Sequence, residues 1–189
     1  TELKKSILDY AIKGFLTKHN DLENIKNDVL KYKEVPFLIP NNWKWCKIKD
    51  ISTLIRGSGI KRNETIEQGV QCIRYGEIYT HYGFSFEKSI SFVSQDIAKN
   101  CKEVFKNDIL LTLTGENEYD IAKATAYLGN EKLVAGGDIA ILTNHHQNPM
   151  YLSYFFASSF CISQKSETAK GNIIVHTSTD KIGNYYIPL

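Results

Sequence analysis

The amino-acid sequence predicts an α+β fold, in which a helical arm precedes a globular domain with a curved, mainly antiparallel sheet and flanking helices. Two observations predict it. Near the start of the chain, apolar residues recur at steps of three or four, which is typical of an amphipathic helix. From Trp43 onward, short alternating or β-branched runs are separated by Gly and Asn turns, which is typical of strands. A chain of 189 residues is long enough to bury one ordinary hydrophobic core.

The helical arm is predicted over residues 1–35 and the globular domain over residues 36–189. A first helix should occupy about eighteen residues, and Asp21 can cap a second, short one. Pro36 and Pro40 then end the helical part. The first helix has too wide an apolar stripe to stand alone in water, so it must pack against its own domain or another chain. The stripe includes Leu3, Ile7, Leu8, Ile12 and Phe15.

The globular domain is expected to consist mostly of short strands. The apolar run at 109–114 should be a buried strand, and a tyrosine-rich segment that follows residue 75 should belong to the sheet. Pro149 can begin a helix that extends to about residue 166. The other expected strands are 45–48, 50–55, 70–75, 89–93, 122–128, 138–142, 173–175 and 185–189.

The overall charge gives little support for nucleic-acid binding, because 23 basic residues nearly balance 21 acidic ones. The distribution is uneven, however. Residues 43–74 contain seven Lys or Arg and only three Asp or Glu. Two interpretations remain open for this segment, a solvated loop and a patch that faces phosphates.

Cysteine usage and hydropathy give expectations about location. The four cysteines are widely spaced, with no CxxC pair, which argues against a zinc ribbon and a disulfide framework. No apolar run approaches the roughly 20 residues that a bilayer span requires. We therefore expect a cytoplasmic protein that makes no membrane contact.

The sequence contains no recognisable motif for catalysis. The sequence has no GxxxxGK[ST] phosphate loop and no GxSxG elbow. A metal-dependent nuclease would need an acidic residue and an acid-x-Lys triplet on adjacent strands, and Asp108 has no such partner on the next strand. An exposed turn explains His145 and His146 better than a metal site does. We expect a non-catalytic chain without a bound metal.

Polar and glycine-rich clusters lie at the ends of two expected strands, at residues 114–119 and 170–172. Amide and charged side chains on loops held by a rigid sheet can bond to base edges. Turn formation explains the same residues, because Gly and Asn are common in turns for conformational reasons. Both interpretations stay open on the residues alone.

Several segments, in their order and spacing, resemble the specificity subunits of type I restriction-modification systems. Residues 3–17 (LKKSILDYAIKGFLT) resemble the end of a conserved helical region in that family, and residues 34–45 (EVPFLIPNNWKW) resemble the start of a target-recognition domain. Further similar segments are 73–78 (IRYGEI), 104–110 (VFKNDIL), 151–154 (YLSY) and 170–189. The resemblance covers essentially the whole chain.

The resemblance implies a DNA-binding subunit that is not itself catalytic. In that family, two recognition domains each read half of a split sequence in double-stranded DNA. Long conserved helices separate the domains and dock modification subunits, which hold S-adenosylmethionine and transfer the methyl group. Restriction subunits, which translocate and cleave DNA, can join the complex. This chain has one such domain, so we expect a fragment or a half-subunit, with no cofactor of its own.

The resemblance also interprets the arm as part of the coiled-coil spacer. We therefore predict self-association of the isolated chain through Leu3, Ile7, Leu8, Ile12 and Phe15. Two rival functions remain: a protein-interaction scaffold and, with less support, a metal-dependent nuclease.

Candidate DNA contacts follow from side-chain chemistry on loops at strand ends. For phosphates we choose the cations Lys61 and Arg62, and next Arg56 and Lys170. Tyr75, like Tyr79 and Tyr82, could stack on or wedge between bases, although partly buried sheet residues would have the same sequence pattern. The residues chosen for base edges are Arg74, Glu116, Asn117, Asn172 and His176.

Overall fold

The computed structural model describes residues 2–16, 37–169, 171 and 174–189, and it confirms the α+β class. Short helices and strands alternate along most of the described chain. The helices are α1 (Glu2–Ile12), α2 (Ile48–Ile51), the 3-10 helix η2 (Arg62–Glu64), α3 (Tyr75–Thr80), α4 (Gln95–Ala98), α5 (Pro149–Phe155), α6 (Ser159–Thr168) and α7 (Thr179–Gly183).

The first of two five-stranded sheets is the centre of the molecule. Its strands in spatial order are β2 (Thr53–Arg56), β12 (Ile139–Thr143), β8 (Ile109–Thr112), β10 (Ala124–Tyr127) and β5 (Ser85–Phe86). All neighbours are antiparallel except β10 and β5. Every residue of β8 and β10 is buried, as the apolar sequence of β8 predicts.

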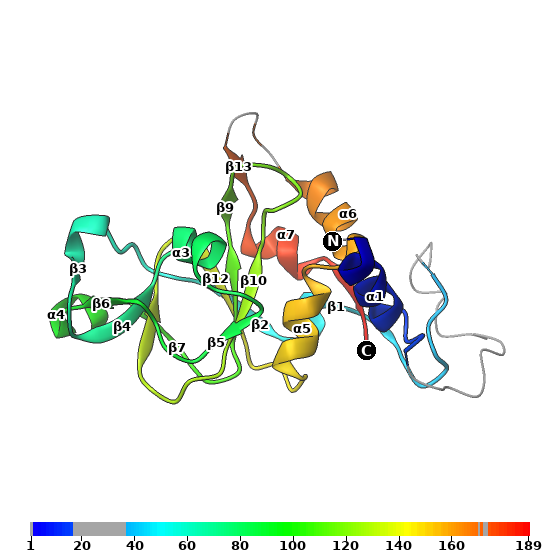
Figure 1. The fold of residues 1–189 in the computed structure, drawn as a ribbon, viewed down its shortest axis with the longest axis horizontal. Helices are drawn as coiled ribbons and strands as arrows, with labels where there is room; N and C mark the ends of the chain where they lie inside the picture. The colour runs from blue at the N-terminus through cyan, green and yellow to red at the C-terminus, as the bar shows by residue number, and fades with distance from the viewer. Residues whose placement is uncertain (1, 17–36, 170, 172–173) are drawn as a thin grey trace.

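The second five-stranded sheet lies at one end of the molecule, on the left in Figure 1. Its strands in spatial order are β3 (Thr65–Ile66), β6 (Ser91–Val93), β4 (Val70–Ile73), β11 (Leu133–Ala135) and β7 (Lys102–Val104). Only β4 and β11 run parallel. The mainly antiparallel character is thus confirmed, but the strands are divided between two sheets where the sequence predicted one.

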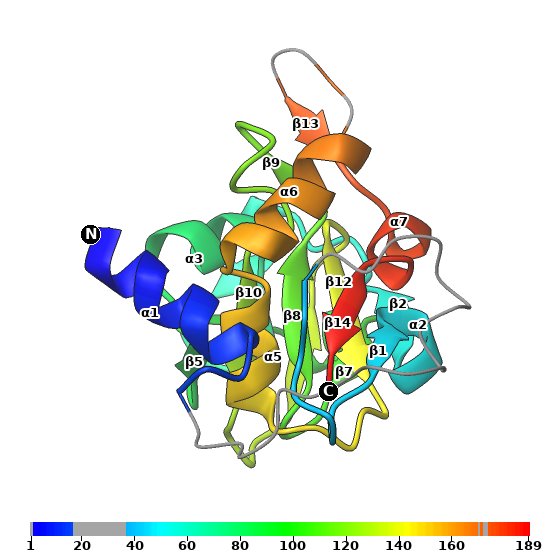
Figure 2. The ribbon, with the colours of Figure 1, turned by 90° about the vertical axis from the view of Figure 1, so that its right-hand side faces the viewer.

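Two short ribbons complete the strand pairing. β1 (Trp45–Lys47) pairs with β14 (Tyr186–Pro188), which joins the start of the globular part to the last described residues. β9 (Thr114–Gly115) pairs with β13 (Val175–His176), and Figures 1 and 2 show this ribbon projecting from the body of the molecule.

The largest hydrophobic cluster lies between the first sheet and the helices that cover it. Buried residues of α5, α6 and α7 contribute to it, and Phe155 and Phe156 are among its largest fully buried side chains. Figure 2 shows α1, α5 and α6 lying together on one side of this sheet. Ile12 of α1 belongs to the same cluster with 1% of its surface exposed, so the arm helix is anchored in the core.

The arm helix is shorter than the sequence predicted. It ends at Ile12, and Gly14 adopts a φ of 77°, a left-handed conformation that favours glycine. Leu8 is partly buried against the core, whereas Leu3, Ile7 and Phe15 are exposed by 69%, 49% and 48%. Ile12 therefore packs within its own chain, and self-association through the exposed residues stays a prediction. The predicted second helix and the boundary at residue 36 lie outside the described residues.

The tyrosine-rich segment is a helix, so its assignment to the sheet was wrong. The Glu77 carboxylate accepts the backbone N–H of Arg74 at 3.0 Å, which caps the first turn of α3, and Ile78 is fully buried. Cap formation and burial of one face thus outweigh the strand preference of Tyr and Thr. A helix also replaces the first residues of the strand expected at 50–55, because α2 precedes β2.

The long helix predicted after Pro149 consists of two helices. Asn148 caps α5 through bonds to the N–H groups of Met150 and Tyr151, and Ser158 caps α6 by accepting the N–H of Cys161. As the N-cap of α6, Ser158 has an extended backbone conformation, with a ψ of 152°, and this interrupts the helical path that begins at Pro149. None of the helices in the described part of the chain has the length and apolar character needed to cross a bilayer.

Candidate nucleic-acid interface

A groove of about 660 Å³ lies beside α3. Figure 1 shows α3 between the part of the chain that carries β3 and the projecting β9–β13 ribbon. The loop after β2 with the start of η2, helix α3 with its flanking residues, and the turn between β11 and β12 form the walls of this groove. Its polar and aromatic lining residues are Arg62, Arg74, Tyr75, Glu77, Thr80, His81 and Asp138.

The loop after β2 links the two five-stranded sheets. The N–H of Gly57 donates to the carbonyl of Ile139 in the first sheet at 2.9 Å, and the N–H of Ser58 donates to the carbonyl of Ala135 in the second at 3.0 Å. A Cβ on Gly57 would lie only 2.2 Å from the carbonyl oxygen of Gly136. The close backbone approach requires glycine, and it holds the loop that leads to Arg62 against the turn that carries Asp138.

Arg74 and Glu77 form the best-organised polar group of the groove. Two guanidinium nitrogens of Arg74, Nε and Nη2, donate to Glu77 Oε1 at 3.0 and 2.7 Å. The hydroxyl of Ser91 donates to the same oxygen at 2.6 Å. Glu77 is 5% exposed, and these bonds provide the partners that a buried carboxylate needs.

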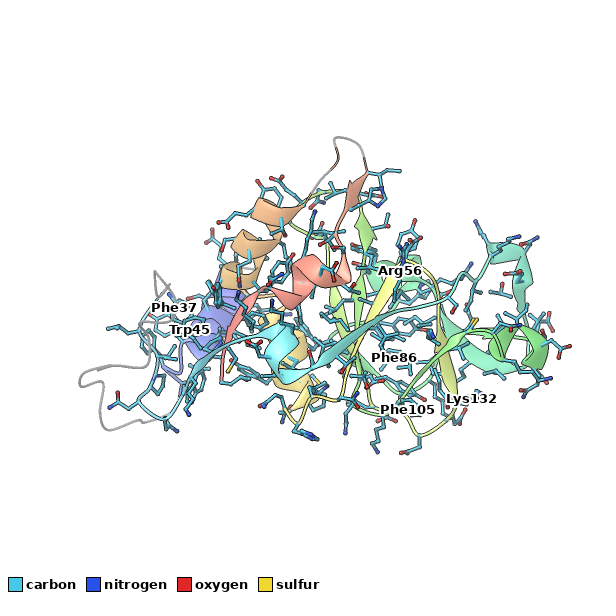
Figure 3. All side chains as sticks on the ribbon, turned by 180° about the vertical axis from the view of Figure 1, so that it is seen from behind. Phe37, Trp45, Arg56, Phe86, Phe105 and Lys132 are labelled. Carbon is cyan, nitrogen blue, oxygen red and sulfur yellow. The ribbon has the colours of Figure 1, made fainter. Side chains whose placement is uncertain are left out.

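Arg56 lies at the edge of the first sheet, where Figure 3 labels it, and belongs to the same region. Its Nε donates to the carbonyl of Gly137 at 2.7 Å, and its Nη2 lies 3.1 Å from Asp138 Oδ1. The two side chains are 65% and 45% exposed, so water screens this ion pair and it contributes little to stability. Arg56 thus keeps an exposed cation beside the groove.

On its other side, α3 is tied to the base of the ribbon through Tyr79. The Tyr79 hydroxyl lies 2.8 Å from Thr112 Oγ1 and donates to the carbonyl of Thr114 at 3.3 Å. Burial raises the pKa of Tyr79 to about 12, so the phenol stays neutral. Lys123 Nζ donates to the Tyr79 carbonyl at 3.2 Å. The hydroxyl of Tyr79 is therefore bonded within the protein and ties α3 to the base of the ribbon.

The residues predicted on the ribbon side have different environments. The Asn117 amide is used within its own turn, because Oδ1 accepts the N–H groups of Tyr119 and Asp120 and Nδ2 donates to Asp120 Oδ2. Glu116 is exposed. His176 is also exposed, with Nδ1 3.3 Å from Thr114 Oγ1. Lys170 and Asn172 lie outside the described residues.

The basic stretch of the sequence does not form one patch. Lys47 lies over the ring of Tyr186 at 5.3 Å, and Lys49 Nζ donates to Asn184 Oδ1 at 2.9 Å. Arg62 and Arg74 instead line the groove, with the exposed Lys61 next to Arg62. The structure thus divides the cations between a surface at α7 and β14 and the surroundings of the groove.

Sequence reasoning missed Glu77, His81 and Asp138 as members of this region. An arginine followed three residues later by glutamate was a possible signal for the first, because these positions meet at a helix start. Asp138 follows two glycines, a pattern that indicates a turn and does not indicate which loop lies opposite. No signal for His81 is apparent in the sequence. Within the described residues, no three His, Cys, Asp or Glu residues are grouped as a metal site would require.

A second cavity, of about 390 Å³, lies between the end of α3, the start of β10 and the corner of α5 and α6. Its wall includes Lys165, which is 2% exposed and donates a hydrogen bond from Nζ to the carbonyl of Phe156. Burial lowers the pKa of this lysine from its ordinary value of 10.5. A buried amine of this kind makes stability depend on pH.

Raising the pH is expected to stabilise the wild-type chain relative to Lys165→Met. Between the lowered folded pKa and the unfolded value of 10.5, the unfolded chain binds more protons at Lys165, so the free energy of unfolding rises with pH. Urea unfolding at about pH 7 and about pH 10 measures the difference between the two proteins. Lys132→Met, at a side chain 48% exposed, is the control. The expectation is contradicted if the free energies of unfolding of the wild-type chain and of Lys165→Met differ by the same amount at both pH values.

Comparisons with known proteins bear on the fold. No protein-family model and no curated protein matches the sequence. Among solved structures, the HsdS subunit from Thermoanaerobacter tengcongensis is similar at a TM-score of 0.59 and 12% identity, over 100% of this chain and 40% of that one. A chain from a structure on complex assembly and conformational transition of the type I R-M system is similar at 0.58 and 13%, over 100% and 41%.

This chain therefore spans about 40% of the length of the solved chains that it matches. At these identities the similarity concerns the fold, and it extends over the whole chain. By its fold, this chain is a domain like those of the S subunits of type I restriction-modification systems.

Proposed function

We propose that this chain is a DNA-recognition domain of a type I restriction-modification specificity subunit and reads one half of a split duplex sequence. The observation that carries the proposal is the similarity of its whole fold to an HsdS subunit. The groove beside α3 adds a surface with the right chemistry, because basic, aromatic and hydrogen-bonding side chains meet there on a rigid scaffold.

In this proposal the cations around the groove hold the phosphate backbone. Lys61 and Arg62 are exposed on the segment that begins η2, and Arg56 is exposed at the end of β2. Contacts of this kind set the register of a protein on duplex DNA and make affinity depend on salt. Side chains inside the groove and on the β9–β13 ribbon then read bases.

The chemistry of modification is assigned to partner subunits. Modification subunits would hold S-adenosylmethionine and transfer the methyl group, and a restriction subunit would cleave, while this chain binds and orients the DNA. The modest net charge of +2 is compatible with a subunit whose partners supply part of the nonspecific affinity for DNA.

The test is the double substitution Lys61→Ala and Arg62→Ala. Loss of two phosphate contacts should weaken binding to specific and random duplexes alike and should flatten the slope of log affinity against log salt by about 1.8. Fluorescence anisotropy across a salt series measures both quantities. The matched control is Lys47→Ala with Lys49→Ala, which removes the same charge from the surface at Tyr186 and Asn184 and should leave the slope unchanged.

Two outcomes would contradict the proposal. Absence of salt-dependent duplex binding by the wild-type chain, alone and with its modification partner, would leave the scaffold interpretation. Cleavage of DNA by this chain alone in the presence of magnesium would favour the nuclease interpretation.

A further inference from the structure

Arg74 presents one edge of its guanidinium group to the protein and another to the groove. Nε and Nη2 donate to Glu77 Oε1, and this pairing uses two of the five N–H groups of an arginine. The end of the fork, formed by Nη1 and the second N–H of Nη2, is not used by Glu77. The Arg74 side chain lines the groove with 27% of its surface exposed.

Glu77 is held firmly enough to orient Arg74. Its Oε2 accepts the backbone N–H of Arg74 at 3.0 Å, while its Oε1 also accepts the hydroxyl of Ser91 at 2.6 Å. The carboxylate is 5% exposed and cannot rotate without losing these bonds. A guanidinium in a fixed plane loses little conformational freedom when it binds a ligand.

The charge of the groove distinguishes a base from a phosphate as the group that meets Arg74. Two arginines, Arg62 and Arg74, line it together with two acids, Glu77 and Asp138. Glu77 directly neutralises Arg74, and Asp138 lies within 3.1 Å of Arg56. Because Glu77 neutralises Arg74 directly, a phosphate would gain little from this arginine, whereas an uncharged base edge with two acceptors matches its fork.

The walls of the groove leave space for a flat group. Four lining residues are glycines, and a Cβ on one of them, Gly76, would have no heavy atom within 4 Å. A Cβ on Gly136 would lie 3.1 Å from the carbonyl oxygen of Ile73 and 3.8 Å from Cγ of Arg74, so the backbone here runs close beneath the arginine stem. Tyr75, 39% exposed at the start of α3, lines the same groove and adds an aromatic side chain to it.

We propose that Arg74 reads a guanine of duplex DNA, donating from the end of its guanidinium to O6 and N7 in the major groove, and that Glu77 is the positioning residue that holds it. This inference rests on the proposed function, and it names the base that one part of the site recognises. Arg74 forms the specific contact, while Lys61 and Arg62 bind phosphates.

The experiment selects duplexes from a randomised library with the 189-residue chain and then measures affinities for the selected duplex and its single-base variants. The wild-type chain should select a guanine at one fixed position. Arg74→Lys keeps the charge beside Glu77 but removes the fork, and it should lower the preference for that guanine by about 5- to 150-fold. Affinity for random duplex should stay within about twofold, because phosphate contacts are retained.

Three further variants distinguish the loss of base recognition from a loss of folding and from a change in charge. Arg62→Lys should leave the strength of the guanine preference and its position in the sequence unchanged, because a lysine can still bind a phosphate as a point charge. Glu77→Gln keeps an oxygen acceptor and should lower the preference less than Arg74→Lys does. If Arg74→Lys unfolds, the double variant Arg74→Met with Glu77→Gln replaces it, because it leaves no buried carboxylate without a partner; it should lose the preference as well.

The outcomes distinguish this inference from the proposed function. A wild-type chain that selects a sequence without guanine, or that keeps its guanine preference after folded Arg74 substitutions, overturns the assignment of Arg74 and leaves the proposed function standing. A wild-type chain without salt-dependent duplex binding overturns both.

Discussion

Gly57→Ala is expected to lower the free energy of unfolding by about 2–4 kcal/mol. The added Cβ would lie 2.2 Å from the Gly136 oxygen and 2.8 Å from the Ala135 oxygen, and both belong to backbone. Gly136 cannot easily move, because its N–H donates to the carbonyl of Ile73 at 2.8 Å. Relief of the clash would therefore separate the loop from the turn and weaken the bonds that join the two sheets. Chemical denaturation measures the loss.

Gly59→Ala is the matched control in the same loop. A Cβ there would meet no heavy atom within 4 Å, so the free energy of unfolding should change by no more than about 0.5 kcal/mol. Equal losses of stability from the two substitutions would contradict the close approach at Gly57 as the cause of the cost, because Gly59 has no such contact.

The same substitution should also affect recognition. The segment from Gly57 leads to Arg62, and the turn that it contacts leads to Asp138, so displacement of one from the other widens the groove between them. We expect Gly57→Ala to reduce the sequence preference of the chain more than its affinity for random duplex. Selection from a randomised library measures this directly.

Local patterns in the sequence predict much of the secondary structure. The apolar run at β8, the turn residues before β12 and Pro149 at the start of α5 are signals that act within a few residues. The pairing of strands is different. β4 lies parallel to β11, some sixty residues later, and no local pattern specifies this partner. The division into two sheets was missed for this reason.

The candidate site shows the same limit. Arg62 and Arg74 could be named from residue type and from the basic segment. Their meeting with Asp138 depends on the close approach of Gly57 to Gly136, which no pattern in the sequence indicates. Asn117 was named for the same chemistry, but its amide serves the turn, as the alternative interpretation allowed. Residue type identifies candidates, and tertiary structure decides which side chains remain available.

Ile12→Ala is expected to lower the free energy of unfolding by about 2–4 kcal/mol. Ile12 is 1% exposed and lies in the cluster that contains Phe155 and Leu152, so truncation leaves a cavity between α1 and the helices beneath it. Ile7→Ala makes the same chemical change on the same helix at a residue 49% exposed, and it should cost no more than about 0.5 kcal/mol.

The pair of substitutions also separates the two roles of the arm helix. If Leu3, Ile7 and Phe15 mediate self-association, Ile7→Ala shifts the mass of the chain toward the monomer in sedimentation experiments, without loss of stability in the monomer. Ile12→Ala should instead speed hydrogen exchange in both α1 and the core. Exchange that increases in α1 alone would contradict the placement of Ile12 in a shared core, because it would mean that the helix detaches by itself. A wild-type chain that is monomeric at high concentration would contradict self-association, and the exposed face of α1 would then be an ordinary solvated surface.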